Sequence, residues 1–289
     1  MNEQKSFVEE GEKGVLYIVP TPIGNLQDMT FRAVDTLRTV HFIAAEDTRQ
    51  TKKLLNHFDI HTPLVSYHEH NKEASGEKII AALLEGKHVA LVSDAGTPTI
   101  SDPGYELVMS ALNVNCKVIP LPGANAAVTA LTASGLPTSH FYFYGFLPRH
   151  KKEKKKELEQ LKHIKDTLIF YEAPHRLQET LAIMHRVFGN RKMVVARELT
   201  KRFEQFIRGT IEEVMHWAEH HEIRGEFCLL IEGNHVTLND ESVWWDHLTI
   251  VEHVNYYMEV KQYTSKEAIK QVAKDRQLPK RDVYEAYHK

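Results

Sequence analysis

Cysteine is scarce in this chain of 289 residues, which contains only Cys116 and Cys228. Two distant cysteines provide neither a disulfide framework nor a zinc site, and this usage is typical of a reducing compartment. No apolar run approaches the roughly 18–20 residues that a membrane-spanning helix needs. The polar, acidic first ten residues also lack the apolar core of a signal peptide. We therefore expect a cytoplasmic protein without a membrane partner.

The sequence also lacks several familiar site motifs. We find no GxGxxG after a strand, no GxxxxGK[ST] loop and no GxSxG elbow, which argues against dinucleotide, P-loop and α/β-hydrolase sites. The 18 histidines are dispersed, and the pair His68 and His70 has no third ligand close in sequence. We therefore expect no metal site.

A basic excess is absent as well, because 36 Lys and Arg stand against 39 Asp and Glu, for a net charge of −3. Nucleic-acid binders usually carry excess positive charge, so the total charge does not favour an RNA ligand. The distribution is uneven, since residues 149–156 (RHKKEKKK) hold six basic residues and one Glu. On composition alone this run fits a solvated helix or loop as well as an RNA contact.

Short apolar strands alternate with helices along the first half of the chain. Strands are expected at 15–19, 41–45, 88–93 and 116–120, and helices at 31–40, 77–84 and 105–112, with another opening at 123. Thr30 is positioned to cap the first helix. Such alternation predicts a mostly parallel sheet covered by helices, with ligands beyond the carboxyl ends of the strands.

A second alternating series follows the aromatic stretch 141–146 and the basic run. We expect strands at 167–171, 192–197 and 226–232, helices at 177–188 and 210–220, and two short helices after Ser265 around Leu278 and Pro279. The predicted fold class is therefore α/β, with α/β domains at residues 14–137 and 138–240 and a small helical tail at 241–289.

Six loops concentrate turn-forming and charged residues where ligands of α/β sheets bind. They are PTPIGN (20–25), EDTR (46–49), SYHEHN (66–71), SDAGTPTISDPG (93–104), PLPGANAA (120–127) and FYEAPHR (170–176). Each loop alone also fits an ordinary tight turn. The loop 93–104 is longer than a simple connection requires, and it predicts a ligand site.

In order and spacing, the strings VPTPIGNLQDMT, AAEDTR, LVSDAGTPTISDPGY, PGANAA and IFYEAPHR resemble the ribosomal RNA small subunit methyltransferase I family. That family belongs to the tetrapyrrole-methylase-like enzymes that use S-adenosylmethionine (SAM). The resemblance covers roughly residues 14–234. It implies two α/β domains with SAM in the cleft between them, a homodimer, and 2′-O-methylation of a decoding-centre cytidine in 16S rRNA.

The resemblance also implies which residues hold SAM. These are Pro22 and Gly24, then Asp94, Gly96, Thr97 and Ile100, then Pro122, Gly123 and Ala126, and finally Tyr171, Glu172 and Ala173. Relatives that act on tetrapyrroles carry a glycine-rich first loop, from which PTPIGN departs. That departure favours the RNA branch of the superfamily.

Methyl transfer to a hydroxyl is an in-line displacement, so positioning and a base both help. We expect Glu46, Asp47 and Arg49 to orient the ribose–phosphate, with Arg49 on a phosphate and Asp47 or His68 as the base. Alternatively, the acids of this tetrad pair with Arg49 and only hold a turn. With the family in view, RNA contacts are expected at Arg149, Lys151, Lys152, Lys154, Lys155, His175 and Arg176.

Two other functions remain open at this point. One is methylation of a tetrapyrrole-like small molecule, which leaves the basic run without a role. The other is a non-catalytic RNA-binding factor of ribosome assembly, for which complete SDAGTPTISDPG and EDTR loops are not needed. The expected partner is 16S rRNA or the small ribosomal subunit.

Overall fold

The structure is a computed structural model that describes residues 3–6, 12–234, 244–245 and 247–288. It divides into two compact units, Met1–Gly233 and Asn234–Lys289. The first contains both sheets, and the second contains only helices among its described residues. The expected α/β class with a helical tail is confirmed. The expected boundary at 240–241 lies outside the described residues.

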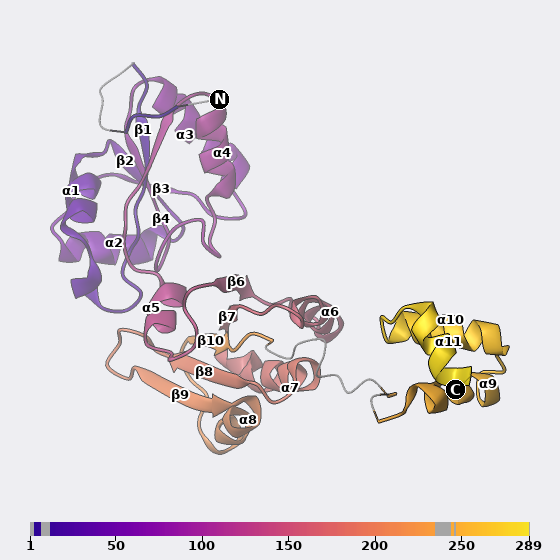
Figure 1. The fold of residues 1–289 in the computed structure, drawn as a ribbon. Helices are drawn as coiled ribbons and strands as arrows, with labels where there is room; N and C mark the ends of the chain where they lie inside the picture. Colours follow the sequence, from indigo (N-terminus) through magenta and orange to yellow (C-terminus); the bar gives the residue numbers. More distant parts are fainter. Residues whose placement is uncertain (1–2, 7–11, 235–243, 246, 289) are drawn as a thin grey trace. The chain divides into compact units, whose positions relative to one another are not determined.

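The first sheet is entirely parallel, as its alternating pattern predicts. Its strand order is β3-β2-β4-β1-β5 (Figure 1), and every neighbouring pair runs in the same direction. The strands are β1 (Val15–Ile18), β2 (Phe42–Ala45), β3 (Leu64–Ser66), β4 (Val89–Val92) and β5 (Lys117–Pro120). The carboxyl ends of β1, β2, β4 and β5 lead directly into four of the six loops that concentrate turn-forming and charged residues.

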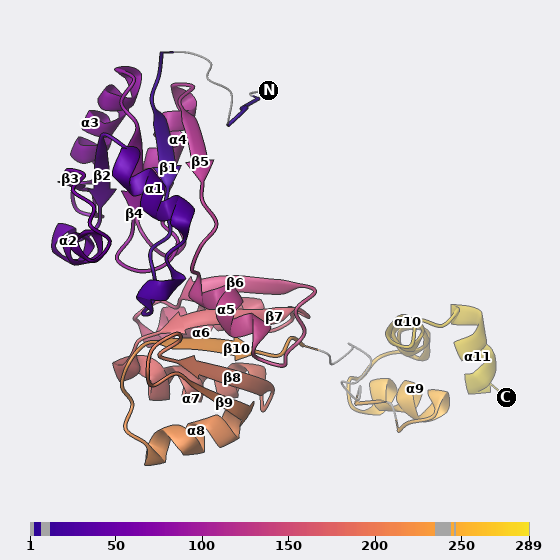
Figure 2. The ribbon, with the colours of Figure 1, turned by 90° about the vertical axis from the view of Figure 1, so that its left-hand side faces the viewer.

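Helices cover both faces of the first sheet, as Figures 1 and 2 show. Because side chains alternate along a strand, Ile43 packs with one layer and Ala44 with the other. The first layer holds α1 (Phe31–Thr39) and α2 (Thr48–His57), and the second holds α3 (Lys72–Leu84) and α4 (Tyr105–Asn113). A short 3-10 turn, η1 (Leu26–Asp28), precedes α1, whose cap is Thr30 as expected.

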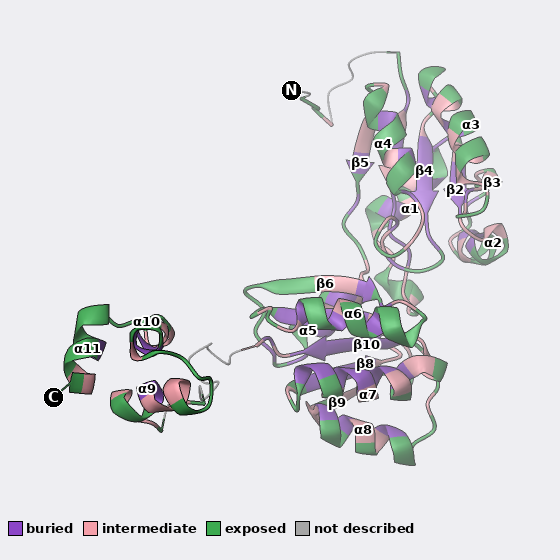
Figure 3. Cartoon of the chain, turned by 90° about the vertical axis from the view of Figure 1, so that its right-hand side faces the viewer, coloured by how far each residue is buried: buried purple, intermediate pink, exposed green. Residues whose placement is uncertain are grey.

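The second sheet has the order β6-β7-β10-β8-β9 and is mostly antiparallel. Only β6 and β7 run parallel, and the remaining neighbours are antiparallel. Figure 3 shows β10 buried in its centre and β6 exposed at its edge. The strands are β6 (Phe141–Phe146), β7 (Thr167–Glu172), β8 (Lys192–Arg197), β9 (Gln205–Thr210) and β10 (Phe227–Ile231).

Helices also cover both faces of the second sheet. One face carries α6 (Lys151–Leu161), the turn η2 (Pro174–Arg176), α7 (Leu177–Phe188) and α8 (Ile211–His220). The other face packs on α5 (Ala126–Thr132), whose Ala127, Ala130 and Leu131 contact Cys228 and Leu230 in one apolar cluster. The expected limit at residue 137 assigns α5 to the N-terminal domain, yet its apolar face is buried on the second sheet.

The tail unit contains three short helices among its described residues: α9 (Ile250–Glu259), α10 (Ser265–Asp275) and α11 (Lys280–His288). The two helices predicted after Ser265 are confirmed, and α9 is additional. Thr249 and Thr264 begin α9 and α10 with capping boxes. Val254, Val272 and Val283 share a small core. Among the described residues, no helix is both long and apolar enough to cross a bilayer.

Candidate functional site

Hydrogen bonds tie the loops after β1, β4 and β5 into one layer. The N–H of Thr21 donates to the carbonyl of Gly96 at 2.9 Å, and the N–H of Gly96 donates back at 2.9 Å. The hydroxyl of Thr97 donates to the carbonyl of Ala124 at 3.0 Å. The loops after β1 and β4 are therefore fixed to each other by their backbones, and the Thr97 side chain adds the loop after β5, as a preformed ligand site requires.

A cavity of about 440 Å³ opens beside this layer, in the first unit. Residues of both sheets and their loops line it. They are Ile23, Glu46, Asp94, Ala95, Gly96, Thr97, Ile100, Ser101, Asp102, Asn125, Ala126, Phe146, Tyr171, Glu172, Ala173, Pro174, Ala196, Leu199, Glu226, Phe227 and Cys228. The volume lies within the usual range for small-molecule sites.

Eight of the twelve residues expected to hold SAM line this cavity: Asp94, Gly96, Thr97, Ile100, Ala126, Tyr171, Glu172 and Ala173. Pro22, Gly24, Pro122 and Gly123 are not among its lining residues. Gly123 has another role, because a Cβ there would lie 2.6 Å from Cβ of Pro20. The loops after β1 and β5 therefore meet at a contact that only glycine permits.

Three carboxylates, Glu46, Asp94 and Asp102, share the cavity wall. Burial, followed by the charge of Glu46, raises the pKa of Asp102 to about 7, although the nearby Ser93 side chain opposes the shift. Burial and the charge of Asp94 likewise raise the pKa of Glu46. Like charges in a partly dehydrated site disfavour ionisation. Perturbed acids of this kind are typical of functional sites.

Asp102 is the main site residue that our sequence reasoning missed. It lies in the loop 93–104 that we singled out, directly before Pro103 and Gly104. Thr99 and Ser101, which precede it, have φ values of 74° and 64°, in the left-handed region. These unusual conformations turn the loop back towards the cavity, and side-chain preferences do not predict them.

Aromatic side chains form the wall on the second sheet. Tyr171 makes edge contacts with Phe143 and Phe146, at centroid distances of 5.1 and 5.5 Å. Its hydroxyl accepts a hydrogen bond of 3.1 Å from the N–H of Ala127, at the start of α5. Burial strongly raises the pKa of Tyr171, and burial also raises the pKa of the Cys228 thiol to about 12. Both groups are therefore protonated at neutral pH.

Hydrogen bonds and a contact with Arg176 fix the carboxylate of Glu172, the residue that follows Tyr171. Thr180 donates to Oε2 at 2.5 Å, the N–H of Ala173 donates to Oε1 at 2.9 Å, and Arg176 Nε lies 3.4 Å from Oε1. The ammonium of Lys154 in turn donates to Thr180 at 2.8 Å. Glu172 thus fixes the turn that presents Ala173 to the cavity.

The EDTR tetrad divides between the cavity and the surface. Glu46 lines the cavity, whereas Asp47 and Arg49 are not among its lining residues. Asp47 caps α2, and Arg49 binds its carboxylate through Nε and Nη2 at 3.1 and 2.8 Å. The Arg49 hydrogen bonds lower the pKa of Asp47 to about 2. The turn-holding alternative describes this pair in the structure, and the expectation that Asp47 is the base stays a prediction.

His68, the other expected base, lies outside the lining residues of the cavity. Its Nδ1 is buried without a hydrogen-bond partner, and its ring is 6.0 Å from that of His70. Its main-chain N–H donates to the side chain of Asn71 at 2.8 Å. The structure therefore places His68 beside the site and not in its wall.

The basic run forms the start of α6, and most of its charges reach solvent. Arg149, Lys151, Lys152 and Lys155 are exposed, as is His175 on the neighbouring turn. Lys151 also forms a 2.9 Å ion pair with Glu179. These exposed groups remain available for phosphates, as expected of an RNA contact.

Two residues expected to contact RNA are instead structural. The side chain of Lys154 is completely buried, and its ammonium bonds to Thr180 and Glu179. It shares the inward face of α6 with Leu158 and Leu161. Arg176 is 15% exposed, and its Nη2 donates to the carbonyls of Leu147 and Pro148. The RNA-contact prediction is wrong at both positions.

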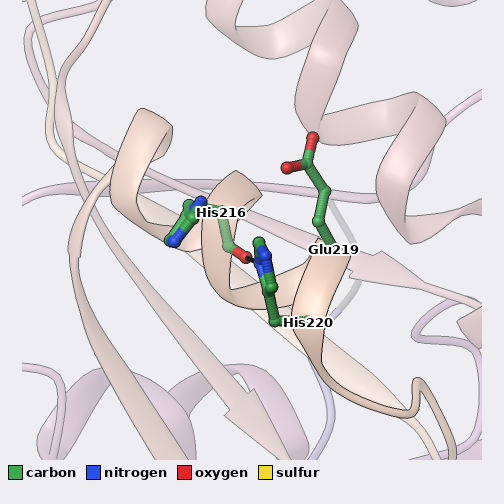
Figure 4. Close-up of side chains that lie close together, drawn as sticks. All are labelled: His216, Glu219 and His220. Carbon is green, nitrogen blue, oxygen red and sulfur yellow. Dashed lines mark hydrogen bonds between the residues drawn. The ribbon is translucent and has the colours of Figure 1, made fainter.

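Among the described residues, one group of side chains has the geometry of a metal site. His216, Glu219 and His220 lie on the exposed face of α8 (Figure 4), with one potential ligand atom from each within 4.8 Å of the others. Nδ1 of His220 lies 2.8 Å from the carbonyl of His216. The H-x-x-E-H spacing of these residues is a candidate that our sequence analysis, which expected no metal site, did not single out. None of the three side chains lines the cavity.

Comparison with known proteins agrees with this architecture. Residues 15–215 match the family of tetrapyrrole (corrin/porphyrin) methylases. Over 289 residues the chain is 61% identical to ribosomal RNA small subunit methyltransferase I of Bacillus subtilis (strain 168), with 100% of this chain and 99% of that protein covered. The protein of the same name from Halalkalibacterium halodurans is 60% identical over 288 residues, with the same coverage of both chains.

Solved structures with the same fold are more distant in sequence. Cobalt precorrin-4 methyltransferase has a TM-score of 0.58 at 17% identity, covering 78% of this chain and 98% of that one. The uroporphyrin-III C-methyltransferase of Thermus thermophilus, solved with the S-adenosyl homocysteine product, has a TM-score of 0.54 at 18% identity, covering 76% and 97%. These two show the shared fold, and the close relatives show more. The chain belongs to the tetrapyrrole methylases and, within them, to the ribosomal RNA small subunit methyltransferase I group of methyltransferases.

Proposed function

We propose that this protein uses SAM to methylate the ribose 2′-hydroxyl of a decoding-centre cytidine in 16S rRNA. One observation carries the RNA substrate: full-length identity of 61% to a protein named as a ribosomal RNA small subunit methyltransferase. The small-molecule alternative rests on the description of the broader methylase family and on structural neighbours below 25% identity, and those neighbours show the fold alone.

The cavity residues fit SAM in size and charge. At about 440 Å³ the cavity suits a cofactor of this class. The carboxylates of Glu46, Asp94 and Asp102 complement a positively charged ligand, and the ring of Tyr171 adds an aromatic wall that attracts cations. A Cβ at Gly96 would approach the side chain of Ile23 to 3.3 Å, so glycine keeps this part of the wall open.

Bound SAM supplies an activated methyl group on a sulfonium. The chain's own contribution is to hold donor and acceptor in line and to exclude water, because displacement at carbon depends strongly on alignment. The loop layer at Thr21 and Gly96 gives the cavity a rigid floor. Glu172 fixes the opposite wall through Ala173 and Arg176.

The exposed cations of α6 supply the RNA affinity in this proposal. Arg149, Lys151, Lys152 and Lys155 offer four charges on one helix and its entry. His175 follows Ala173 and Pro174, which line the cavity, so phosphate contacts continue towards the site. This arrangement also gives the basic run a role that a small-molecule substrate does not provide.

Two further expectations belong to the same proposal. A protein that modifies ribosomal subunits works in the cytoplasm, which fluorescence of a tagged chain in cells tests. The family resemblance implies a homodimer, which light scattering on the purified full chain tests. A mass of about one chain by light scattering would contradict the dimer.

The deciding experiment transfers a labelled methyl group from SAM to small ribosomal subunits that lack their native modifications. Mass spectrometry then maps the product. We expect label on the 2′-oxygen of one decoding-region cytidine, and loss of label with Asp94→Arg, which places a long cation in the cavity wall. SAM binding without transfer to subunits or free 16S rRNA would exclude this substrate. Label on an added porphyrin instead would favour the small-molecule alternative.

A further inference from the structure

A 2′-hydroxyl must lose its proton when it is methylated, so the cavity needs a proton acceptor. Seven side chains that line the cavity can hold or release a proton. They are Glu46, Asp94, Asp102, Tyr171, Glu172, Glu226 and Cys228. Their hydrogen bonds and surroundings separate the available acceptors from those already engaged.

Four of the seven are unsuited to accept this proton. Tyr171 and Cys228 keep their own protons, because burial raises the pKa of both groups. Both carboxylate oxygens of Glu172 accept hydrogen bonds from the protein. Glu226 is paired with Lys201 at 2.9 Å, and its side chain is 78% exposed. A carboxylate in full contact with water and a lysine is a weak base.

Asp94 is partly engaged as well, because its Oδ1 accepts the main-chain N–H of Asp47 at 3.0 Å. The remaining candidates are Glu46 and Asp102, which both line the cavity, and the charge of Glu46 contributes to the raised pKa of Asp102. Asp102 has the larger perturbation, and its pKa of about 7 matches a base that works near neutral pH.

The groups around Asp102 come from three parts of the fold. Glu46 follows β2, Ser93 and Asp94 follow β4, and Tyr171 belongs to β7. Both charged neighbours are acids, so they favour proton uptake by Asp102. The nearby Ser93 side chain opposes it. No cation among the described residues appears as a cause of the shift at Asp102.

We propose that Asp102 is the general base of methyl transfer and that Glu46 is the neighbouring charge that tunes it. This inference rests on the proposed function. The 2′-oxygen forms its bond to the methyl carbon while the carbon–sulfur bond breaks and leaves its electron pair on sulfur. The hydroxyl proton passes to the carboxylate of Asp102 and then to water. No other reactant is required.

The test measures single-turnover methyl transfer between pH 5.5 and 9, at saturating SAM and small subunits, with SAM affinity measured separately. The variants are Asp102→Asn, Glu46→Gln and the control Asp35→Asn, which alters an exposed acid on α1. We expect Asp102→Asn to slow transfer by about 10²–10⁴-fold and to abolish the pH dependence while SAM still binds. Glu46→Gln moves the midpoint of the pH profile to lower pH, and Asp35→Asn matches the wild type.

Two results would overturn the assignment. One is an Asp102→Asn rate within threefold of the wild type. The other is a pH midpoint that persists in Asp102→Asn and vanishes in Glu46→Gln, which would make Glu46 the base. Failure of the wild type itself to methylate subunits would overturn the proposed function, and with it this inference. The wild-type reaction therefore separates the two failures.

Discussion

The main-chain N–H of Asp47 donates to Oδ1 of Asp94 at 3.0 Å, which joins the end of β2 to the end of β4. Asp94 therefore has two roles in the site. Its oxygen anchors the start of α2, and its charge faces the cavity. Substitutions that remove these two properties separately can distinguish them.

Asp94→Asn keeps an oxygen for the Asp47 N–H and removes the charge, whereas Asp94→Ala removes both. We expect Asp94→Asn to weaken SAM binding with little loss of stability. Asp94→Ala weakens binding further and destabilises the fold by about 1 kcal/mol, because a hydrogen bond is lost. Calorimetric titration with SAM and thermal unfolding measure the two effects. Equal SAM affinity in all three proteins would contradict a role for this charge.

Gly96→Ala tests the open wall of the cavity, and Gly135→Ala is its matched control. The two glycines have φ values of +84° and +81°, so each substitution carries a similar backbone strain of about 1–2 kcal/mol. A Cβ at Gly96 meets Ile23 at 3.3 Å, whereas nothing lies within 4 Å of a Cβ at Gly135. We expect both variants to unfold at lower temperature and only Gly96→Ala to bind SAM more weakly. Matching losses of SAM affinity would show that strain alone is responsible.

The neighbours Lys154 and Lys155 are expected to affect different properties. Lys154→Met removes a buried ammonium from Thr180 and Glu179, so we expect a loss of about 1–3 kcal/mol in the free energy of unfolding. Lys155→Met changes an exposed side chain and leaves stability within about 0.5 kcal/mol. Lys155→Met weakens binding to subunits. It also lowers the slope of log Kd against log salt concentration by the contribution of about one phosphate contact. Denaturant titrations and subunit binding at several salt concentrations distinguish these effects. Reversed behaviour of the two variants would refute the assignment.

Asp102→Asn is expected to stabilise the protein while it impairs transfer. Because the folded pKa of about 7 exceeds the unfolded value of 3.8, the folded state binds more protons between these values. Stability contributed at this position is therefore present at low pH and is lost as pH rises towards 7. Asparagine avoids that loss, so we expect a gain of about 1–2 kcal/mol at pH 8, discounted for partial solvent screening, and a smaller gain at pH 5. Calorimetric unfolding at both pH values is the measurement, and a variant less stable at pH 8 would refute the expectation.

The exposed cluster on α8 predicts zinc binding away from the cavity. With Nδ1 of His220 donating to the carbonyl of His216, Nε2 is left free to coordinate a metal. We expect titration with zinc chloride to lose one site in His220→Gln, whereas His61→Gln, which alters another exposed histidine, keeps it. Methyl transfer is unchanged in both variants. Identical zinc stoichiometry in the wild type and His220→Gln would contradict the site.

Strong periodicity made several elements predictable to the residue. The helix 177–188 and the strand 192–197 have the predicted limits, because a continuous apolar pattern stops at Gly189 and Asn190. The helix Thr48–His57 and the strands Leu64–Ser66 and Gln205–Thr210 were missed. The helix is largely polar, the first strand has three residues, and the last is an edge strand whose sequence QFIRGT has no regular alternation of polar and apolar residues.

The sequence predicted which loops form the site, but it did not predict the role of each residue in those loops. Motif order brought eight of the residues expected to hold SAM to one cavity, and the pairing of Asp47 with Arg49 was open as an alternative. The partners of Arg176 depend on contacts that no spacing reveals. The burial of Lys154 was detectable, because Lys154, Leu158 and Leu161 recur at helical spacing on one face. Among the six basic residues of the run 149–156, Lys154 could be identified as buried because its position lies on the apolar face of the helix.

The location of α5 has a consequence for how this protein is made and divided. Its residues precede the second sheet in the chain, yet they cover the face that contains Cys228 and Leu230. A fragment that starts at residue 138 would expose that apolar face to water and would tend to aggregate. During synthesis, the helix emerges before the sheet on which it packs and must wait for β10, the last strand to be translated. A fragment that carries the second sheet therefore needs α5 as well, so a cut at residue 137 does not release the second sheet with its apolar face covered.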